Sequence, residues 1–161
     1  PTTAVDTTAA ATTAPPTPRV LRAGEVVGVP FGTPESEALS RLTEILGSPS
    51  EPTATHLGGG GGNYRPFGPL TVMFYEATPG AGDRTLSHWL LDAPDDTWTT
   101  DAGIALGSSE AAVLSAYPAA TVTNEDECDN APYIISDDIE FSLDPSSRTV
   151  DGIGSPSYGF C

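Results

Sequence analysis

The chain has 161 residues and is strongly acidic, with 22 Asp and Glu residues, 6 basic residues that are all arginine, and a net charge of −16. This charge argues against binding to nucleic acid or to an anionic membrane, because both require positive charge on the protein to displace counterions. The absence of lysine also excludes a phosphate-loop lysine, a Schiff base and a Ser-Lys dyad. The length suits one substantial domain or two small units that share a core.

The first 18 residues are a low-complexity segment of Thr, Ala and Pro with one charge, Asp6. Such a composition has no apolar periodicity and too little hydrophobicity to offset the entropy of ordering it. We therefore predict that residues 1–19 form a stalk or arm ahead of the folded part. It is either a flexible stalk that tethers the domain to a wall or lipid anchor, or an extended arm that adds to a sheet edge of its own or a neighbouring copy.

A stretch with the pattern Gly-x-x-x-Gly-[Thr/Ser]-x-Glu-x-x-x-Leu occurs twice, at residues 28–39 and, 75 positions later, at residues 103–114. A repeat of this period indicates two copies of one supersecondary unit. We predict a first repeat over residues 20–98 and a second repeat over residues 99–161. Without any lysine, the glycines are better explained as turn residues that lead into two helices than as phosphate loops.

In the first repeat, Thr33 is predicted to cap a helix, Pro34 occupies its first position, and Gly47 ends it. The predicted elements are, in chain order, a helix over 33–46, a loop over 50–69 that includes five glycines at 58–62, and strands over 70–76 and 84–92. The strands are predicted from their β-branched and aromatic residues. The glycine run is interpreted as a hairpin tip or linker.

The second repeat is predicted to begin with a shorter helix that Ser108 or Ser109 caps and Pro118 ends. Four strands are predicted after it, over 120–123, 133–136, 139–143 and 149–153. Each repeat is then a helix followed by antiparallel strands. The sequence therefore predicts an α+β fold in which two tandem helix-plus-antiparallel-strand repeats form one sheet with helices on one face.

The chain contains two cysteines, Cys128 and Cys161. We predict a disulfide between them, because a C-terminal cysteine is difficult to bury as a core residue; two separate buried thiols are the alternative. A disulfide indicates an oxidising compartment and therefore a secreted, extracellular or cell-surface protein. No apolar run approaches the roughly 18 residues that a membrane span requires, so direct insertion in a membrane is not expected.

Acidic residues gather in two groups near the C-terminus. These groups are Glu125, Asp126, Glu127 and Asp129, followed by Asp137, Asp138 and Glu140. Hard oxygen ligands in loops suit Ca²⁺, so the first group provides candidate calcium ligands. No EF-hand pattern is present, and a solvated acidic surface is the alternative interpretation.

The two histidines, His56 and His88, do not match any catalytic or metal-binding pattern. The sequence has no Gly-x-Ser-x-Gly elbow, no His-x-x-x-His and no Cys-x-x-Cys. Paired carboxylates of the glycosidase type would need an aromatic sugar-binding cleft, and most aromatic residues fall at predicted core positions. We therefore predict no catalytic residues, no cofactor other than Ca²⁺, and a protein that is not an enzyme.

The repeated Gly-x-x-x-Gly motif, followed by Leu46-Gly-Ser-Pro49, resembles the helical start of two families. These are the small lipoprotein subunit of the bacterial outer-membrane assembly machine and the secreted β-lactamase-inhibitor proteins, which are tandem repeats. Residues 100–108 and Leu114-Ser-Ala-Tyr-Pro118 resemble uncharacterised secreted proteins of actinobacteria. The resemblance covers residues 26–49 and 99–161. The inhibitors carry a disulfide in each repeat, whereas the first repeat here has no cysteine, so no contact residues are carried over.

The resemblance implies a non-enzymatic domain, exported from a bacterium, that binds another protein or belongs to the cell envelope. We expect a protein-binding module displayed on its stalk, with the exposed face of the sheet as docking surface and acidic loops that select a basic partner. The alternative is self-assembly into an extracellular structural subunit, such as a filament or surface layer, whose N-terminal arm packs on a neighbouring copy.

Overall fold

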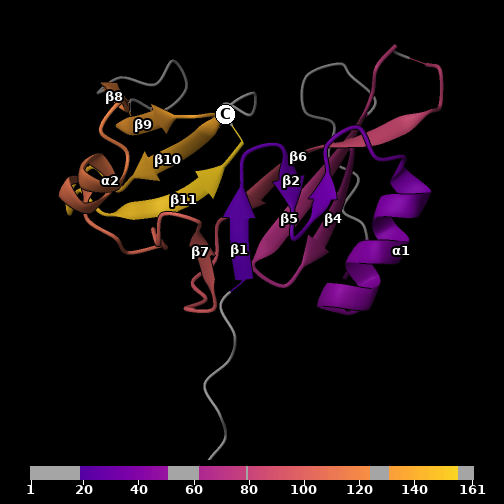
Figure 1. Cartoon of the computed structure of the whole chain (residues 1–161), viewed down its shortest axis with the longest axis horizontal. Coiled ribbons are helices and arrows are strands. Elements are labelled where there is room, and N and C mark those ends of the chain that lie inside the picture. The colour runs from indigo at the N-terminus through magenta and orange to yellow at the C-terminus, as the bar shows by residue number, and fades with distance from the viewer. Residues whose placement is uncertain (1–18, 51–61, 79, 124–130, 156–161) are drawn as a thin grey trace, which may run out of the picture.

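The computed structural model describes residues 19–50, 62–78, 80–123 and 131–155, so the predicted arm over residues 1–18 lies outside it. The first elements in chain order are β1 (Arg19–Arg22), β2 (Glu25–Val26), β3 (Val29–Pro30), α1 (Glu35–Leu46), β4 (Asn63–Phe67), β5 (Leu70–Glu76) and β6 (Arg84–Leu91). They are followed by β7 (Trp98–Thr100), α2 (Glu110–Ala116), β8 (Thr121–Thr123), β9 (Tyr133–Ser136), β10 (Ile139–Leu143) and β11 (Val150–Gly154). Figure 1 shows the two helices at opposite ends of the molecule.

The strands form two sheets. The larger sheet has seven strands in the order β4-β5-β6-β11-β10-β9-β8, and the smaller has four in the order β3-β2-β1-β7. At the centre of the larger sheet, β6 pairs antiparallel with β11 through Leu91 and Ile153. In the smaller sheet, β1 pairs in parallel with β7, which joins residues nearly 80 positions apart, from Arg19 to Trp98.

The α+β fold class predicted from the sequence is wrong. The described chain is mostly β, with eleven strands in two sheets and only two short helices of 12 and 7 residues. The physical reason is that the segment ahead of α1 and the segment at residues 98–100 are themselves strands. They pair with each other in a separate sheet and do not extend a single helix-covered sheet.

The two helices begin differently. The N-cap of α1 is Pro34, which has no side-chain cap, and Thr33 donates its hydroxyl to the Pro30 carbonyl at 2.7 Å. The predicted Thr33 cap is therefore wrong, because this hydroxyl closes the preceding turn. The prediction for the second helix is confirmed at Ser109, whose hydroxyl oxygen accepts the Ala112 N–H at 3.2 Å.

A single hydrophobic core joins both sheets and both helices. Its largest fully buried side chains include Trp89, Trp98, Phe74 and Phe141. The helices contribute few core residues, with Ala38 and Leu42 from α1 and Val113 from α2. Burial of large side chains from the strands therefore supplies most of the hydrophobic stabilisation.

The repeated glycine motif forms the same backbone arrangement twice. In the first clasp (residues 32–34 against 85–86), the Gly32 N–H donates to the Leu86 carbonyl at 2.7 Å and the Leu86 N–H donates to the Thr33 carbonyl at 2.8 Å. The second clasp (residues 107–109 against 149–150) has the same two bonds at 2.7 and 2.8 Å, and each clasp ends in an isolated bridge. Gly32 and Gly107 have φ values of +84° and +83°, which favour glycine.

The match between the clasps extends into the strands. β6 carries an extra residue, Ser87, where its register with β5 shifts, and β11 carries Asp151 where its register with β10 shifts. Each clasp also carries an ion pair from the first residue of its helix to the arginine directly before the opposite segment of the clasp. These pairs are Glu35 with Arg84, at 3.8 Å, and Glu110 with Arg148, at 2.8 Å. The two segments are therefore equivalent in local structure from the glycine turn to the bulge.

Candidate functional site

Most of the sequence-predicted site residues lie outside the described part of the chain. This holds for Cys128 and Cys161 of the predicted disulfide, for His56, and for the calcium candidates Glu125, Asp126, Glu127 and Asp129. Within the described residues, no group of three or more His, Cys, Asp and Glu side chains is placed to hold a metal ion. The second acidic group is split, because Asp137 and Asp138 form the turn between β9 and β10 while Glu140 is buried on β10.

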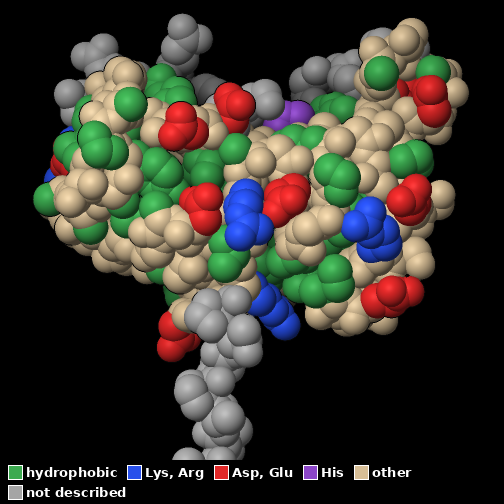
Figure 2. Space-filling view, viewed as in Figure 1, with side chains coloured by type: hydrophobic (Ala, Val, Ile, Leu, Met, Phe, Trp, Pro, Cys, Tyr) green, Lys and Arg blue, Asp and Glu red, His purple; other side chains and the backbone are tan. Residues whose placement is uncertain are grey.

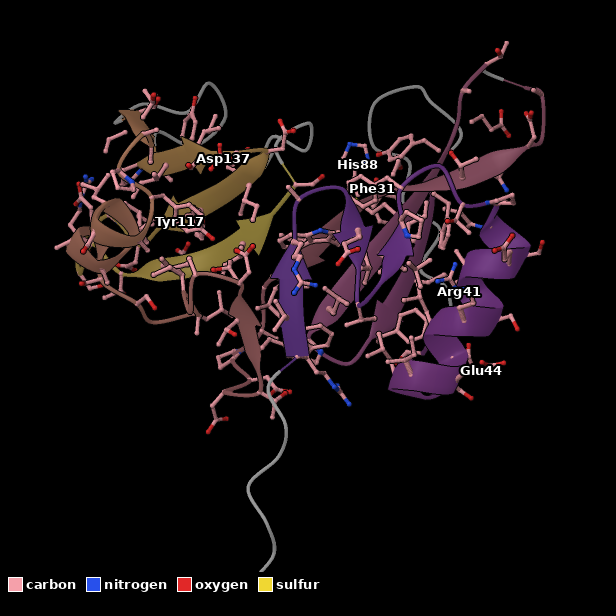
Figure 3. The ribbon with its side chains drawn as sticks, in the orientation of Figure 1. Phe31, Arg41, Glu44, His88, Tyr117 and Asp137 are labelled. Carbon is pink, nitrogen blue, oxygen red and sulfur yellow. The ribbon has the colours of Figure 1, made fainter. Side chains whose placement is uncertain are left out.

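His88 lies at the β6 bulge, half-buried between aromatic rings. Its ring centroid is 5.2 Å from that of Tyr75 and 6.5 Å from that of Phe31. Figure 3 shows Phe31 and His88 next to each other. Burial lowers the pKa of the imidazole below its ordinary value, so His88 is neutral at pH 7.

The hydrogen bonds of Ser87 determine which nitrogen of His88 carries the proton. The Ser87 hydroxyl donates to the Met73 carbonyl at 3.2 Å, because a carbonyl only accepts. Its oxygen therefore accepts from Nδ1 of His88, 2.9 Å away, and Nδ1 carries the proton. A nucleophilic serine must instead donate its proton to histidine. The donor and acceptor roles in the Ser87–His88 pair are the opposite of these, which argues against a serine nucleophile at position 87.

A groove of about 580 Å³ lies between the loop that follows β6, the second clasp and the start of β11. Its lining residues are Asp92, Pro94, Asp95, Asp96, Leu106, Gly107, Val150 and Asp151. The aspartates provide four carboxylates of one sign, while Pro94, Leu106 and Val150 provide apolar surface. We call this feature the acidic groove.

Two of the four carboxylates are held by hydrogen bonds. Asp95 accepts the Thr97 hydroxyl at 2.6 Å and the Thr97 N–H at 2.8 Å, and these bonds lower the pKa of its carboxyl group, with a smaller contribution from the charge of Arg19. Asp151 accepts the hydroxyl of Ser142. None of the four forms an ion pair with a described residue. The groove is therefore a region of negative charge on partly fixed side chains.

The arginines of the chain are already engaged elsewhere. Five of the six form ion pairs: Arg22 with Glu25, Arg41 with Glu37, Arg65 with Glu35, Arg84 with Glu35 and Glu76, and Arg148 with Glu110. The sixth, Arg19, lies over the ring of Trp98 at 5.2 Å. Acidic side chains outnumber basic ones on the face shown in Figure 2. The charge of Arg19 also acts on Asp95, but this single cation is outnumbered by four carboxylates, so the groove keeps an excess of negative charge.

A second hollow, of about 600 Å³, opens beside the first clasp. Its charged lining residues are Glu35, Asp83 and Arg84, and Arg84 pairs with Glu35 across it. Because opposite charges already meet there, this hollow has weaker selectivity for a charged ligand than the acidic groove.

Comparison of the chain with protein-family models, curated proteins and solved structures gave no match. No described helix has the length and apolar character that a membrane span requires, in agreement with the expectation of no direct membrane insertion.

The acidic groove was not predicted from the sequence, because residues 94–96 follow the strand predicted over 84–92 and match no binding motif. One signal was present in the sequence: no Lys or Arg occurs between Arg84 and Arg148, although acidic residues recur throughout that stretch. This asymmetry indicates a negatively charged surface but not its shape. Leu106 and Asp151 line the acidic groove because of the way the second clasp packs. Such packing produces no local pattern in the sequence.

Proposed function

We propose that this chain is an exported, non-enzymatic binding module that docks a basic partner protein in the acidic groove and is displayed on its Thr/Pro-rich N-terminal segment. The observation that carries the proposal is the groove itself, which combines four carboxylates with apolar surface from Pro94, Leu106 and Val150, while five of the six arginines form ion pairs elsewhere. Complementary charge of this kind selects partners and accelerates their association.

The groove is a better candidate for docking than the exposed face of the sheet, where the sequence placed it. A docking site needs a concave surface with a few convergent polar groups, and the groove has both. The self-assembling subunit that the sequence also suggested depends on residues 1–18, so the described residues add no support to it.

The proposal is tested with dye-labelled peptides of matched length that are basic, neutral or acidic, added to the full chain and followed by fluorescence anisotropy. We expect only the basic peptide to bind, and more weakly at about 300 mM than at about 50 mM NaCl, because salt screens surface charges. The double variant Asp92→Asn, Asp96→Asn removes two groove charges without breaking the hydrogen bonds of Asp95 and Asp151. It should weaken binding about fivefold or more.

The matched control is the double variant Asp137→Asn, Asp138→Asn, which removes the same charge at the β9–β10 turn. Both residues have positive φ values, +47° and +68°, a conformation that asparagine tolerates well. Equal loss of binding in the groove variant and the control would mean that the net charge attracts the peptide everywhere. That result would refute the groove as the docking site.

A further inference from the structure

We propose that the contact between β6 and β11 is a two-fold symmetric interface that also forms between two copies of this chain, which exchange the segment after residue 97. The partner is therefore a second copy of the chain. The proposal does not depend on the acidic groove, because the register of the strands carries it and not the charge of the surface.

The seven-stranded sheet contains two equivalent three-stranded units, β4-β5-β6 and β9-β10-β11, which lie on either side of the β6–β11 junction (Figure 1). Each unit begins with an antiparallel hairpin, and its third strand adds antiparallel to the second. This third strand carries one extra residue in each unit, Ser87 in β6 and Asp151 in β11. Counted from these residues, Leu90 is equivalent to Gly154, and the two pair directly across the junction.

The contacts on both sides of this central pair obey the same equivalence. Leu91 pairs with Ile153, which is the equivalent of Trp89. The carbonyl of Trp89 in turn accepts the N–H of Ser155, which is the equivalent of Leu91, at 3.1 Å. An interface in which residue i contacts j while j contacts i is the isologous contact of a two-fold dimer. The junction therefore has the geometry of a dimer interface, although one chain supplies both strands.

Exchange between two chains preserves the strand pairings of the monomer. Only two pairings, β1–β7 and β6–β11, join residues before 92 to residues after 97, and both form again with the segments of a second copy. The side chains of Trp89, Leu91 and Ile153 at the junction are fully buried, so their hydrophobic burial is kept as well. Exchange of an identical element is for this reason a low-cost route to a dimer.

The connection at residues 92–97 is the part of the chain that differs between the two forms. In the monomer it ends in a turn, in which the Trp98 N–H donates to the Asp95 carbonyl at 3.3 Å and the Asp95 carboxylate accepts two bonds from Thr97. Asp92, Asp95 and Asp96 line one hollow in this compact connection, so an extended connection reduces their mutual repulsion. The balance between monomer and dimer therefore depends on this connection.

The test refolds the full chain from urea at about 10 µM and at about 1 mM, and separates the products by size-exclusion chromatography with light scattering. A short connection holds the two parts of one chain at an effective concentration of about millimolar order, so we expect a monomer at the lower concentration and a dimer fraction at the higher. A sample refolded from mixed ¹⁵N-labelled and ¹³C-labelled chains should show intermolecular NOEs between β6 and β11 in the dimer.

Two variants change only the length of the connection. Deletion of Asp95 and Asp96 removes the turn that closes it within one chain, whereas insertion of three glycine and serine residues after Asp96 leaves closure possible. A connection that cannot span its sites gives an effective concentration near zero, so the deletion variant should be a dimer already at about 10 µM. The insertion variant should form no more dimer than the original chain.

A deletion variant that folds as a monomer would overturn the proposal, and so would one that stays unfolded, because exchange should restore the junction. A dimer without intermolecular NOEs between β6 and β11 would also overturn it, since the chains would then associate through another surface. The same holds if the original chain gives no dimer at about 1 mM.

Discussion

At the residue scale, His88 is expected to make the stability of the fold depend on pH. Its imidazole is held neutral by burial, which lowers its pKa, and it donates from Nδ1 to Ser87. The unfolded chain binds a proton at this position below the ordinary histidine pKa of about 6.5, whereas the folded chain resists protonation until a lower pH. Just below about pH 6.5, the unfolded state therefore binds more protons than the folded state does. The stability of the folded state must then decrease as the pH falls below this value.

We predict that the free energy of unfolding, measured with urea, is lower at about pH 5.5 than at about pH 7.5. The variant His88→Asn keeps a side-chain N–H for Ser87 but cannot titrate, so its stability should change less between these two values. His56 is present in both proteins and cancels in the comparison. An unchanged pH dependence in the variant would show that His88 is not the responsible group.

At the element scale, the glycine turns of the two clasps are sensitive to substitution because their backbone has a positive φ. A Cβ added at Gly107 meets no atom within 4 Å, so the cost of an alanine there comes from the backbone alone, whose φ is +83°. We predict that Gly107→Ala lowers the free energy of unfolding by about 1–2 kcal/mol. Chemical denaturation measures this change.

Gly32→Ala should cost about the same as Gly107→Ala, because Gly32 has a φ of +84° and the same open surroundings. The control is Ser115→Ala on the exposed face of α2, where a change within about 0.5 kcal/mol is expected. Clearly different costs at the two glycines would contradict the local equivalence of the clasps.

Strands rich in β-branched and aromatic residues could be predicted from the sequence. Short strands that form only by pairing with distant segments could not. The prediction of strands over 133–136 and 139–143 is confirmed by β9 and β10, whose β-branched and aromatic residues carry the signal. The strands β1, β2, β3 and β7 have only two to four residues each. They exist because Leu21 pairs with Val26 on one side and with Thr100 on the other, and no local pattern records such pairing.

The acidic groove was beyond sequence reasoning for the same reason. Three of its aspartates lie within five residues of each other in the loop after β6, but Leu106 and Asp151 reach the groove through the backbone bonds of the second clasp. Those bonds join residues 107 and 150, which lie far apart in sequence. The negative charge could be counted from the sequence, whereas the hollow that gathers these carboxylates with apolar side chains could not be predicted from it.

At the scale of the whole molecule, the expected disulfide between Cys128 and Cys161 remains a prediction. We expect the intact mass to rise on reduction by the weight of two hydrogens, and reduction to lower the free energy of unfolding by about 2–4 kcal/mol. Mass spectrometry with and without reductant, followed by denaturation of each form, measures both. An unchanged mass on reduction would rule the bridge out and remove the main argument for an oxidising compartment.

The position of β11 has a consequence for the order in which the chain folds. This strand is the last described strand in sequence, yet it lies between β6 and β10 in the middle of the seven-stranded sheet (Figure 1). The two sides of that sheet cannot join until residues 150–154 have left the ribosome. Seven of the nine strand pairings join consecutive strands, whereas β1–β7 and β6–β11 join distant ones, and such non-local pairings form late because they must close long loops. The seven-stranded sheet therefore closes only after nearly all of the described residues have been synthesised, so its two halves must each persist until then with an unpaired edge at β6 and at β10.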